Sequence, residues 1–164
     1  MSNTALARFD LALAQAETPD HAYKALNDLV DDTVGAKLFT IMSVNMDAML
    51  ARRAYSSDAA NYPTSGTKEI TINRWFDHVH GKGQTFVANT LNEIDTVFPD
   101  AELIGRLGCG SVINLPVTQD GHLVATMNIL HEEQYYTAAR VSYCNEHLSD
   151  PAHRAVQAAR RLGS

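Results

Sequence analysis

The spacing of apolar residues predicts helices at both ends of the chain. Residues 18–20 (Thr-Pro-Asp) supply a hydroxyl cap, a proline at the first helical position and an acid in the first turn, which together favour a helix start. Tyr23, Leu26 and Leu29 then recur at helical spacing, and Gly35 is a natural stop. Narrower apolar stripes predict terminal helices over residues 4–16 and 150–162.

The strongest strand pattern lies in the second half of the chain. Residues 111–117 are rich in β-branched and aliphatic side chains, and residues 119–122 contain the Asp-Gly pair of a tight turn. Residues 123–130 then predict a returning strand. Two strands this apolar need a covering layer on at least one face.

A second pair of strands is predicted over residues 37–44 and 48–56. In the latter, simple alternation places Ala51, Arg53 and Tyr55 on one side, so that one face carries charge into solvent.

The middle of the chain predicts shorter elements. We expect short strands at residues 68–72 and 85–87, a short helix after Asn73 and another opening at Pro99, whereas residues 91–98 show little regular pattern. This order favours the α+β class, an antiparallel sheet with helices over one face and loops over the other.

Composition and charge exclude several classes of protein. The 164 residues fit one domain with a sizeable core, and 45% hydrophobic with 20% charged residues is ordinary for a soluble globular protein. The net charge of −6 argues against nucleic-acid binding, which needs clustered Lys and Arg. No membrane-spanning apolar run and no signal peptide are found, and two cysteines without Cys-x-x-Cys spacing do not suggest a disulfide scaffold, so we expect a cytoplasmic protein.

Three segments resemble the GAF domain, a ligand-sensing fold related to PAS. They are residues 81–89 (Gly-Lys-Gly-Gln-Thr-Phe-Val-Ala-Asn), 111–117 (Ser-Val-Ile-Asn-Leu-Pro-Val) and 121–130 (Gly-His-Leu-Val-Ala-Thr-Met-Asn-Ile-Leu), and the resemblance covers roughly residues 20–148. It implies a single GAF-like domain over residues 1–164, with about six antiparallel strands and the terminal helices packed on one face. It also implies a small-molecule pocket between the sheet and residues 55–110.

The resemblance implies partners as well. Terminal helices of GAF domains often form a dimerising bundle, which here would involve residues 4–16 and 150–162. GAF domains commonly sit beside an effector, so a free-standing unit is expected to signal through a separate effector protein or to act on its ligand. The sequence identifies no cofactor.

The densest polar and aromatic cluster contains Trp75, His78 and His80, a segment that would line the pocket in a GAF fold. Such side chains can recognise a carboxylate, carbonyl or phosphate. A His-x-His pair can also ligate zinc or iron, with His131 as a candidate third ligand, although nothing in the sequence fixes that third ligand. A solvated helix end is the structural alternative.

Cys109 lies between two glycines at a predicted bend, where backbone amides can bind an anion or lower a thiol pKa. It is the best candidate for a catalytic residue, with a small apolar side chain in a tight turn as the alternative. One free-standing GAF branch, free methionine-(R)-sulfoxide reductase, is enzymatic. Its catalytic cysteine would fall near Gly105 here, and this departure argues against that activity.

Polar residues in apolar strands are further candidates. Asn114 and Asn128 each need a hydrogen-bond partner when buried, which can be a ligand, water or loop backbone, and Ser111 is similar. Tyr55 can supply an aromatic wall with a hydroxyl group. Candidate ligand-binding residues are therefore Tyr55, Trp75, His78, His80, Cys109, Ser111 and Asn128.

Three hypotheses remain open. The first is a sensory or regulatory domain that binds a small polar or anionic metabolite in this pocket. The second is a small enzyme in the same pocket, using Cys109 as a nucleophile or redox centre, or His78 and His80 in acid-base or metal chemistry. The third is an interaction module with a filled core.

Overall fold

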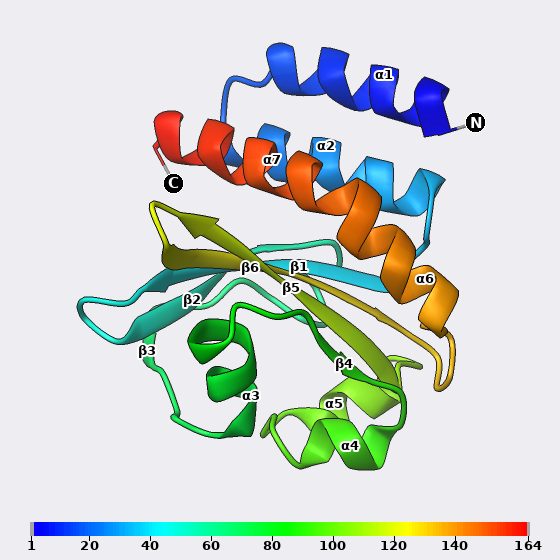
Figure 1. Cartoon of the computed structure of the whole chain (residues 1–164), viewed down its shortest axis with the longest axis vertical. Coiled ribbons are helices and arrows are strands. Elements are labelled where there is room, and N and C mark those ends of the chain that lie inside the picture. The colour runs from blue at the N-terminus through cyan, green and yellow to red at the C-terminus, as the bar shows by residue number, and fades with distance from the viewer. Residues whose placement is uncertain (1, 164) are drawn as a thin grey trace.

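A computed structural model describes residues 2–163, and its centre is a six-stranded antiparallel sheet with helices on both faces (Figure 1). The strand order is β3-β2-β1-β6-β5-β4. The strands are β1 (Leu38–Asn45), β2 (Leu50–Ser56), β3 (Lys68–Glu69), β4 (Phe86–Ala88), β5 (Ser111–Gln119) and β6 (His122–His131). The α+β class and the antiparallel sheet predicted from the sequence are confirmed.

The helices divide between the two faces of the sheet (Figure 1). Three long helices cover one face: α1 (Ser2–Ala14), α2 (Pro19–Asp32) and α7 (Ser149–Arg161), preceded by α6 (Ala138–Tyr143) and the π-helical turn η2 (Cys144–Leu148). The other face carries α3 (Arg74–Phe76), the π-helical turn η1 (Asp77–Gly81), α4 (Leu91–Asp95) and α5 (Ala101–Arg106).

An apolar core lies between the sheet and the long helices. The predicted start of α2 is confirmed, because Thr18 caps the helix by accepting a hydrogen bond from the His21 N–H and Pro19 opens it. Leu26 and Val30 of α2 are buried against Met127 of β6 in one cluster. Figure 1 shows α2 and α7 over the sheet and α1 as an outer layer above them.

The opposite face has a second apolar core beneath residues 62–107. Leu38 of β1 and Leu130 of β6 pack there with Trp75, Val79 and Ile104. Since alternate residues of a strand point to opposite faces, each central strand contributes to both cores.

A β-bulge overturns the predicted alternation in β2. Ile41 of β1 pairs with Tyr55, whereas its neighbour Met42 pairs with Arg53, so Ala54 has no direct partner in the ladder. Directly paired residues share a face, so Tyr55 follows Ile41 to the helix side and Arg53 follows Met42 to the opposite side. The prediction that Arg53 and Tyr55 share a side is therefore wrong.

The segment 91–98, for which we expected no regular structure, contains α4. Thr90 caps this helix and Glu93 reaches back to the Thr90 N–H, a reciprocal capping box. The Thr-x-x-Glu spacing was visible in the sequence, and it is the signal that the apolar pattern alone missed.

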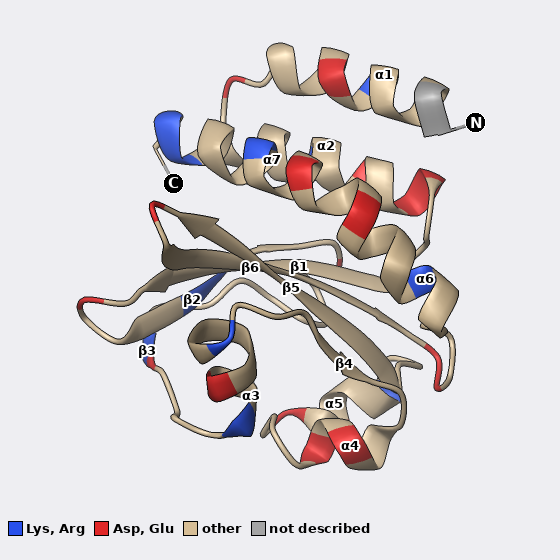
Figure 2. Cartoon of the chain, in the orientation of Figure 1, with Lys and Arg blue, Asp and Glu red and all other residues tan. Residues whose placement is uncertain are grey.

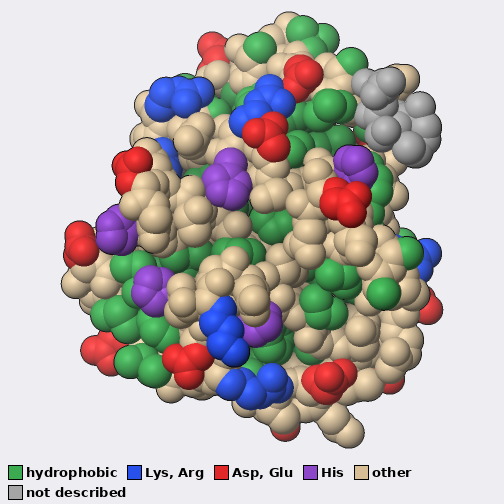
Figure 3. All heavy atoms as spheres, in the orientation of Figure 1, with side chains coloured by type: hydrophobic (Ala, Val, Ile, Leu, Met, Phe, Trp, Pro, Cys, Tyr) green, Lys and Arg blue, Asp and Glu red, His purple; other side chains and the backbone are tan. Residues whose placement is uncertain are grey.

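Charged residues are interspersed over the molecule. Figure 2 shows acidic and basic residues distributed over both layers of helices and over the loops, and on the face shown in Figure 3 the two kinds of side chain are intermixed. Within residues 2–163, no helix combines the length and apolar character that a membrane crossing would require.

Candidate functional site

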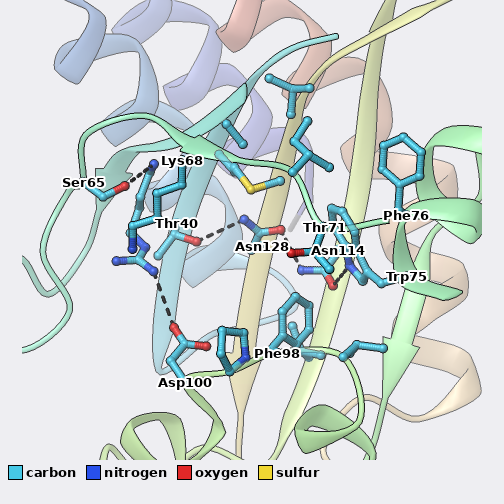
Figure 4. A pocket seen from close by; sticks show the side chains of 18 of the residues that line it. Thr40, Ser65, Lys68, Thr71, Trp75, Phe76, Phe98, Asp100, Asn114 and Asn128 are labelled. Carbon is cyan, nitrogen blue, oxygen red and sulfur yellow. Dashed lines mark hydrogen bonds and ion pairs between the residues drawn. The ribbon is translucent and has the colours of Figure 1, made fainter. Parts of the chain in front are cut away.

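A cavity of about 290 Å³ lies between the sheet and the segments after β2, on the face opposite the long helices. Its walls are mainly apolar, with aromatic rings from α3 and from the loop before α5 (Figure 4). These walls include Met42, Val44, Trp75, Phe76, Ile94, Val97, Phe98, Ile104, Val112, Leu123 and Leu130. A largely apolar lining with few polar groups is typical of small-molecule sites.

A row of polar side chains crosses the floor of this cavity, which we name the amide row: Thr40, Asn128 and Asn114. Asn128 of β6 lies directly opposite both Thr40 of β1 and Asn114 of β5 in the strand register. The Asn128 amide donates to the Thr40 hydroxyl at 3.2 Å, and the Asn114 amide donates to the Asn128 carbonyl at 2.6 Å. Figure 4 shows the three side chains side by side.

Trp75 sets the orientation of the amide row. Its indole N–H donates to the Asn114 carbonyl oxygen at 2.9 Å, in a fully buried bond. Because an indole N–H can only donate, the oxygen of Asn114 must face Trp75 and its NH₂ must face Asn128. Because the NH₂ of Asn114 needs an acceptor, the oxygen of Asn128 faces it and the NH₂ of Asn128 faces Thr40. The Trp75 N–H therefore determines the orientation of both amides.

Charged and aromatic groups meet at one side of the cavity. The Arg53 guanidinium lies 3.7 Å from the centre of the Tyr62 ring, forms an ion pair with Asp100 at 3.6 Å and donates to the Pro63 carbonyl at 2.7 Å. The Tyr62 hydroxyl donates to the same Asp100 carboxylate. Burial, with a smaller effect of Asp100, raises the pKa of Tyr62 above its usual range, so the phenol stays protonated. These contacts tie the loop 57–67 to β2 and to the start of α5.

Two of the seven candidate ligand-binding residues, Trp75 and Asn128, line this cavity. Tyr55 lies on the other face because of the bulge at Ala54. There its hydroxyl accepts a hydrogen bond from Asn27 at 3.3 Å, and its ring contacts Phe39 at 5.8 Å. Tyr55 is part of the helix-side core.

His78 and His80 lie on η1, outside the cavity lining. The His78 Nε2 is 2.8 Å from the Thr85 carbonyl, and the His80 ring packs on Phe76 at 5.0 Å. His131 stacks on Tyr135 at 3.5 Å, and burial lowers its pKa. Across residues 2–163, no group of three or more His, Cys, Asp or Glu side chains is placed to hold a metal ion.

Ser111 and Cys109 are buried beside the cavity without lining it. The Ser111 hydroxyl donates to the Glu132 carbonyl at 2.7 Å, which anchors the end of β6. Burial raises the pKa of the Cys109 thiol, so it is protonated at neutral pH and poorly suited to act as a nucleophile. Cys144 is buried in the helix-side core, so the sheet separates the two thiols. The ligand-binding roles of these residues remain predictions.

Three residues of the site were not among the candidates: Thr40, Arg53 and Asp100. Asn114 was singled out as a polar residue in an apolar strand but was left out of the ligand-binding set. Thr40 and Asn114 carried the same signal as Asn128, a polar residue in an apolar strand. Simple alternation placed Arg53 on the side of Tyr55, and no signal in the sequence marked it as a site residue. Asp100 gave no signal, since its role depends on which residues the fold brings opposite it.

The sequence matches no protein-family model and no curated protein. The structure, in contrast, is similar to solved GAF domains. It matches that of a phosphoenolpyruvate-protein phosphotransferase from Coxiella burnetii with a TM-score of 0.73 at 12% identity, covering 99% of this chain and 96% of that one. It matches that of a two-component sensor histidine kinase from Bacillus halodurans with a TM-score of 0.71 at 12% identity, covering 91% and 100%.

A free methionine-R-sulfoxide reductase from Neisseria meningitidis, solved with its substrate, is also similar, with a TM-score of 0.65 at 12% identity, covering 98% of this chain and 90% of that one. Likeness at this identity defines the fold and not the chemistry. The chain is therefore a GAF-like domain in its fold, as the sequence resemblance implied.

Proposed function

We propose that this GAF-like domain binds a small metabolite in the cavity over the amide row and has a sensory or regulatory role. The observation that carries the proposal is the exposure of Asn128. This residue is in the middle of β6, flanked on both sides by β1 and β5, yet its side chain is only partly buried. Asn128 lines the cavity, so the exposed part of its amide faces the cavity and is accessible to a ligand.

The cost of such an arrangement supports a binding role. Amides placed in an apolar core lose hydration, and they contribute little to stability unless all their hydrogen bonds are made. Packing alone therefore does not explain three polar side chains in register across the central strands. Such side chains can instead orient a ligand in an otherwise apolar pocket.

Cavity filling tests the proposal. Ala51 of β2 lines the cavity, whereas Ala48 is exposed in the turn before β2, so Ala51→Phe and Ala48→Phe form a matched pair. We expect a metabolite library to contain compounds that raise the melting temperature of the wild type and of Ala48→Phe by mass action. The same compounds should leave Ala51→Phe unshifted.

Two outcomes would contradict the proposal. One is a folded wild type that no small metabolite stabilises. The other is a compound that stabilises Ala51→Phe as strongly as the wild type, which would place its binding site elsewhere.

In this proposal the chain works as a sensory unit with partners. A homodimer through α1 and α7, and a separate effector protein that responds to ligand occupancy, are the partners that we expect. Ligand-dependent capture or release of such an effector would distinguish sensing from simple storage of a metabolite.

A further inference from the structure

The hydrogen bonds of the amide row leave donors without acceptors. An Asn NH₂ group has two N–H donors, and a Thr hydroxyl has one. Asn114 and Asn128 each use one N–H within the row, and Thr40 only accepts. Within residues 2–163, the second N–H of each amide and the O–H of Thr40 have no side-chain or carbonyl acceptor, so three donors are uncommitted.

The acceptor oxygens of the amide row, in contrast, each already accept a hydrogen bond. The carbonyl oxygen of Asn114 accepts from Trp75, that of Asn128 accepts from Asn114, and the Thr40 oxygen accepts from Asn128. An oxygen that already accepts one hydrogen bond is largely satisfied, whereas a buried N–H or O–H without an acceptor is rare and costly. The unmet need of the row is therefore for acceptor oxygens.

The remaining lining limits the size and shape of what supplies those oxygens. A volume of about 290 Å³ is at the small end for ligand pockets, which favours a molecule of one or two rings. The rings of Trp75 and Phe98 meet edge to face at 6.0 Å in the wall, an arrangement that suits an aromatic guest. Both signs of charge occur in the lining, with Arg52, Arg53 and Lys68 against Asp100 and Glu69, so charge alone does not define the ligand.

We propose that the cavity selects a compact aromatic molecule whose carbonyl or carboxylate oxygen accepts hydrogen bonds from the Thr40 hydroxyl and from the second N–H of Asn128. The inference rests on the proposed function and specifies its ligand class. The apolar walls contact the ring, and the amide row favours a substituent that accepts hydrogen bonds over one that donates them.

Four one-ring probes test the ligand class: acetophenone and benzoate, which present acceptor oxygens, aniline, which presents N–H donors, and toluene, which presents neither. Their dissociation constants are measured by ligand-observed NMR titration of the full chain. We expect acetophenone and benzoate to bind about tenfold more tightly than toluene and aniline, the difference expected from one to two net hydrogen bonds.

Two variants link this preference to the amide row. Thr40→Val removes one of the two proposed donors and leaves that of Asn128, so we expect the preference for acetophenone over toluene to fall from about tenfold to about threefold. This ratio does not change with a general loss of folded protein. Thr126→Val is the matched control, because Thr126 is on the same face of the sheet but outside the cavity lining. It should keep the wild-type ratio.

The outcomes separate this inference from the proposed function. Equal binding of all four probes, or a preference for aniline, would overturn the inference while leaving a ligand cavity. A preference for acetophenone that survives Thr40→Val and Asn128→Leu would also overturn it. If no probe, toluene included, binds at millimolar concentration, the inference fails, and the metabolite screen with Ala51→Phe decides separately whether the cavity binds a ligand of another class.

Discussion

Thr40 and Thr126 lie on the same face of the sheet, in neighbouring strands, and are both buried, yet their hydroxyl groups differ in their partners. Thr40 accepts a hydrogen bond from Asn128, while the Thr126 hydroxyl has no partner within residues 2–163. A buried hydroxyl without a partner costs about 1 kcal/mol or more relative to an apolar group of the same shape. The two threonines should therefore respond to the same substitution with opposite signs.

We expect Thr126→Val to raise the free energy of unfolding by about 1 kcal/mol, because it removes an unpaired polar group. Thr40→Val should lower it by about 1 kcal/mol, because it leaves the Asn128 amide without its acceptor. Urea denaturation of both variants measures the difference. A destabilised Thr126→Val variant would show that its hydroxyl is hydrogen-bonded in solution and would contradict the prediction.

Cys144 makes the free energy of unfolding depend on pH in the alkaline range. Burial raises its pKa from 9.0 in the unfolded chain to about 12 in the fold. The native state then holds a proton that the unfolded state releases, so the stabilisation is complete below pH 9 and declines as pH rises above it, by up to about 1.4 kcal/mol per pH unit. Cys144→Ala should flatten the slope of unfolding free energy against pH above pH 9. An unchanged slope would exclude this residue as its source.

At the scale of elements, the sequence predicted what local interactions determine and missed what strand pairing determines. The start of α2 followed from Thr18 and Pro19, and the hairpin β5-β6 from the Asp-Gly pair, because caps and turns are set by neighbouring residues. The bulge at Ala54 depends on how β2 pairs with β1, so no local pattern announced it. That single residue explains why Tyr55, which was expected in the pocket, lies on the helix side while Arg53 lines the cavity.

The Arg53 contacts should control the mobility of the loop that follows β2. Arg53→Leu removes the ion pair with Asp100 and the hydrogen bond to the Pro63 carbonyl. We expect the amides of residues 61–66 to exchange hydrogen faster in this variant, with a loss of about 1 kcal/mol of stability. Arg52→Leu, the adjacent substitution, is the control and should leave exchange in this loop unchanged. Equal exchange in both variants would show that Arg53 does not hold the loop.

At the scale of the whole molecule, the fold was predictable and the site only in part. Apolar periodicity and the GAF-like segments identified the layers, since burial of apolar faces determines architecture. Of the candidate residues, Trp75 and Asn128 line the cavity, whereas Thr40, Arg53 and Asp100 reach it through contacts distant in sequence. A site assembled from several separate segments of the chain cannot be derived from the order of residues in any one of them.

The predicted homodimer can be tested on the exposed apolar residues of the outer helix. Leu11 of α1 is 61% exposed, and Ile72, in the loop before α3 on the opposite side of the sheet, is 69% exposed (Figure 1). If α1 forms the dimer contact, Leu11→Glu should yield a monomer in light scattering, because a charge in an apolar interface is costly. Ile72→Glu should keep the dimer. A monomeric wild type, or a dimer in both variants, would contradict this arrangement.

The hydrogen bond between Trp75 and Asn114 has a practical consequence. Trp75 is the only tryptophan in the sequence, and its indole both lines the cavity and holds the end of the amide row. Indole emission responds to the polarity around the ring and to the hydrogen bond of its N–H. With excitation beyond the absorption of the six tyrosines, the intrinsic fluorescence of the unlabelled protein therefore comes from one residue in the cavity wall. Rapid mixing experiments can use it to follow ligand binding and release in real time.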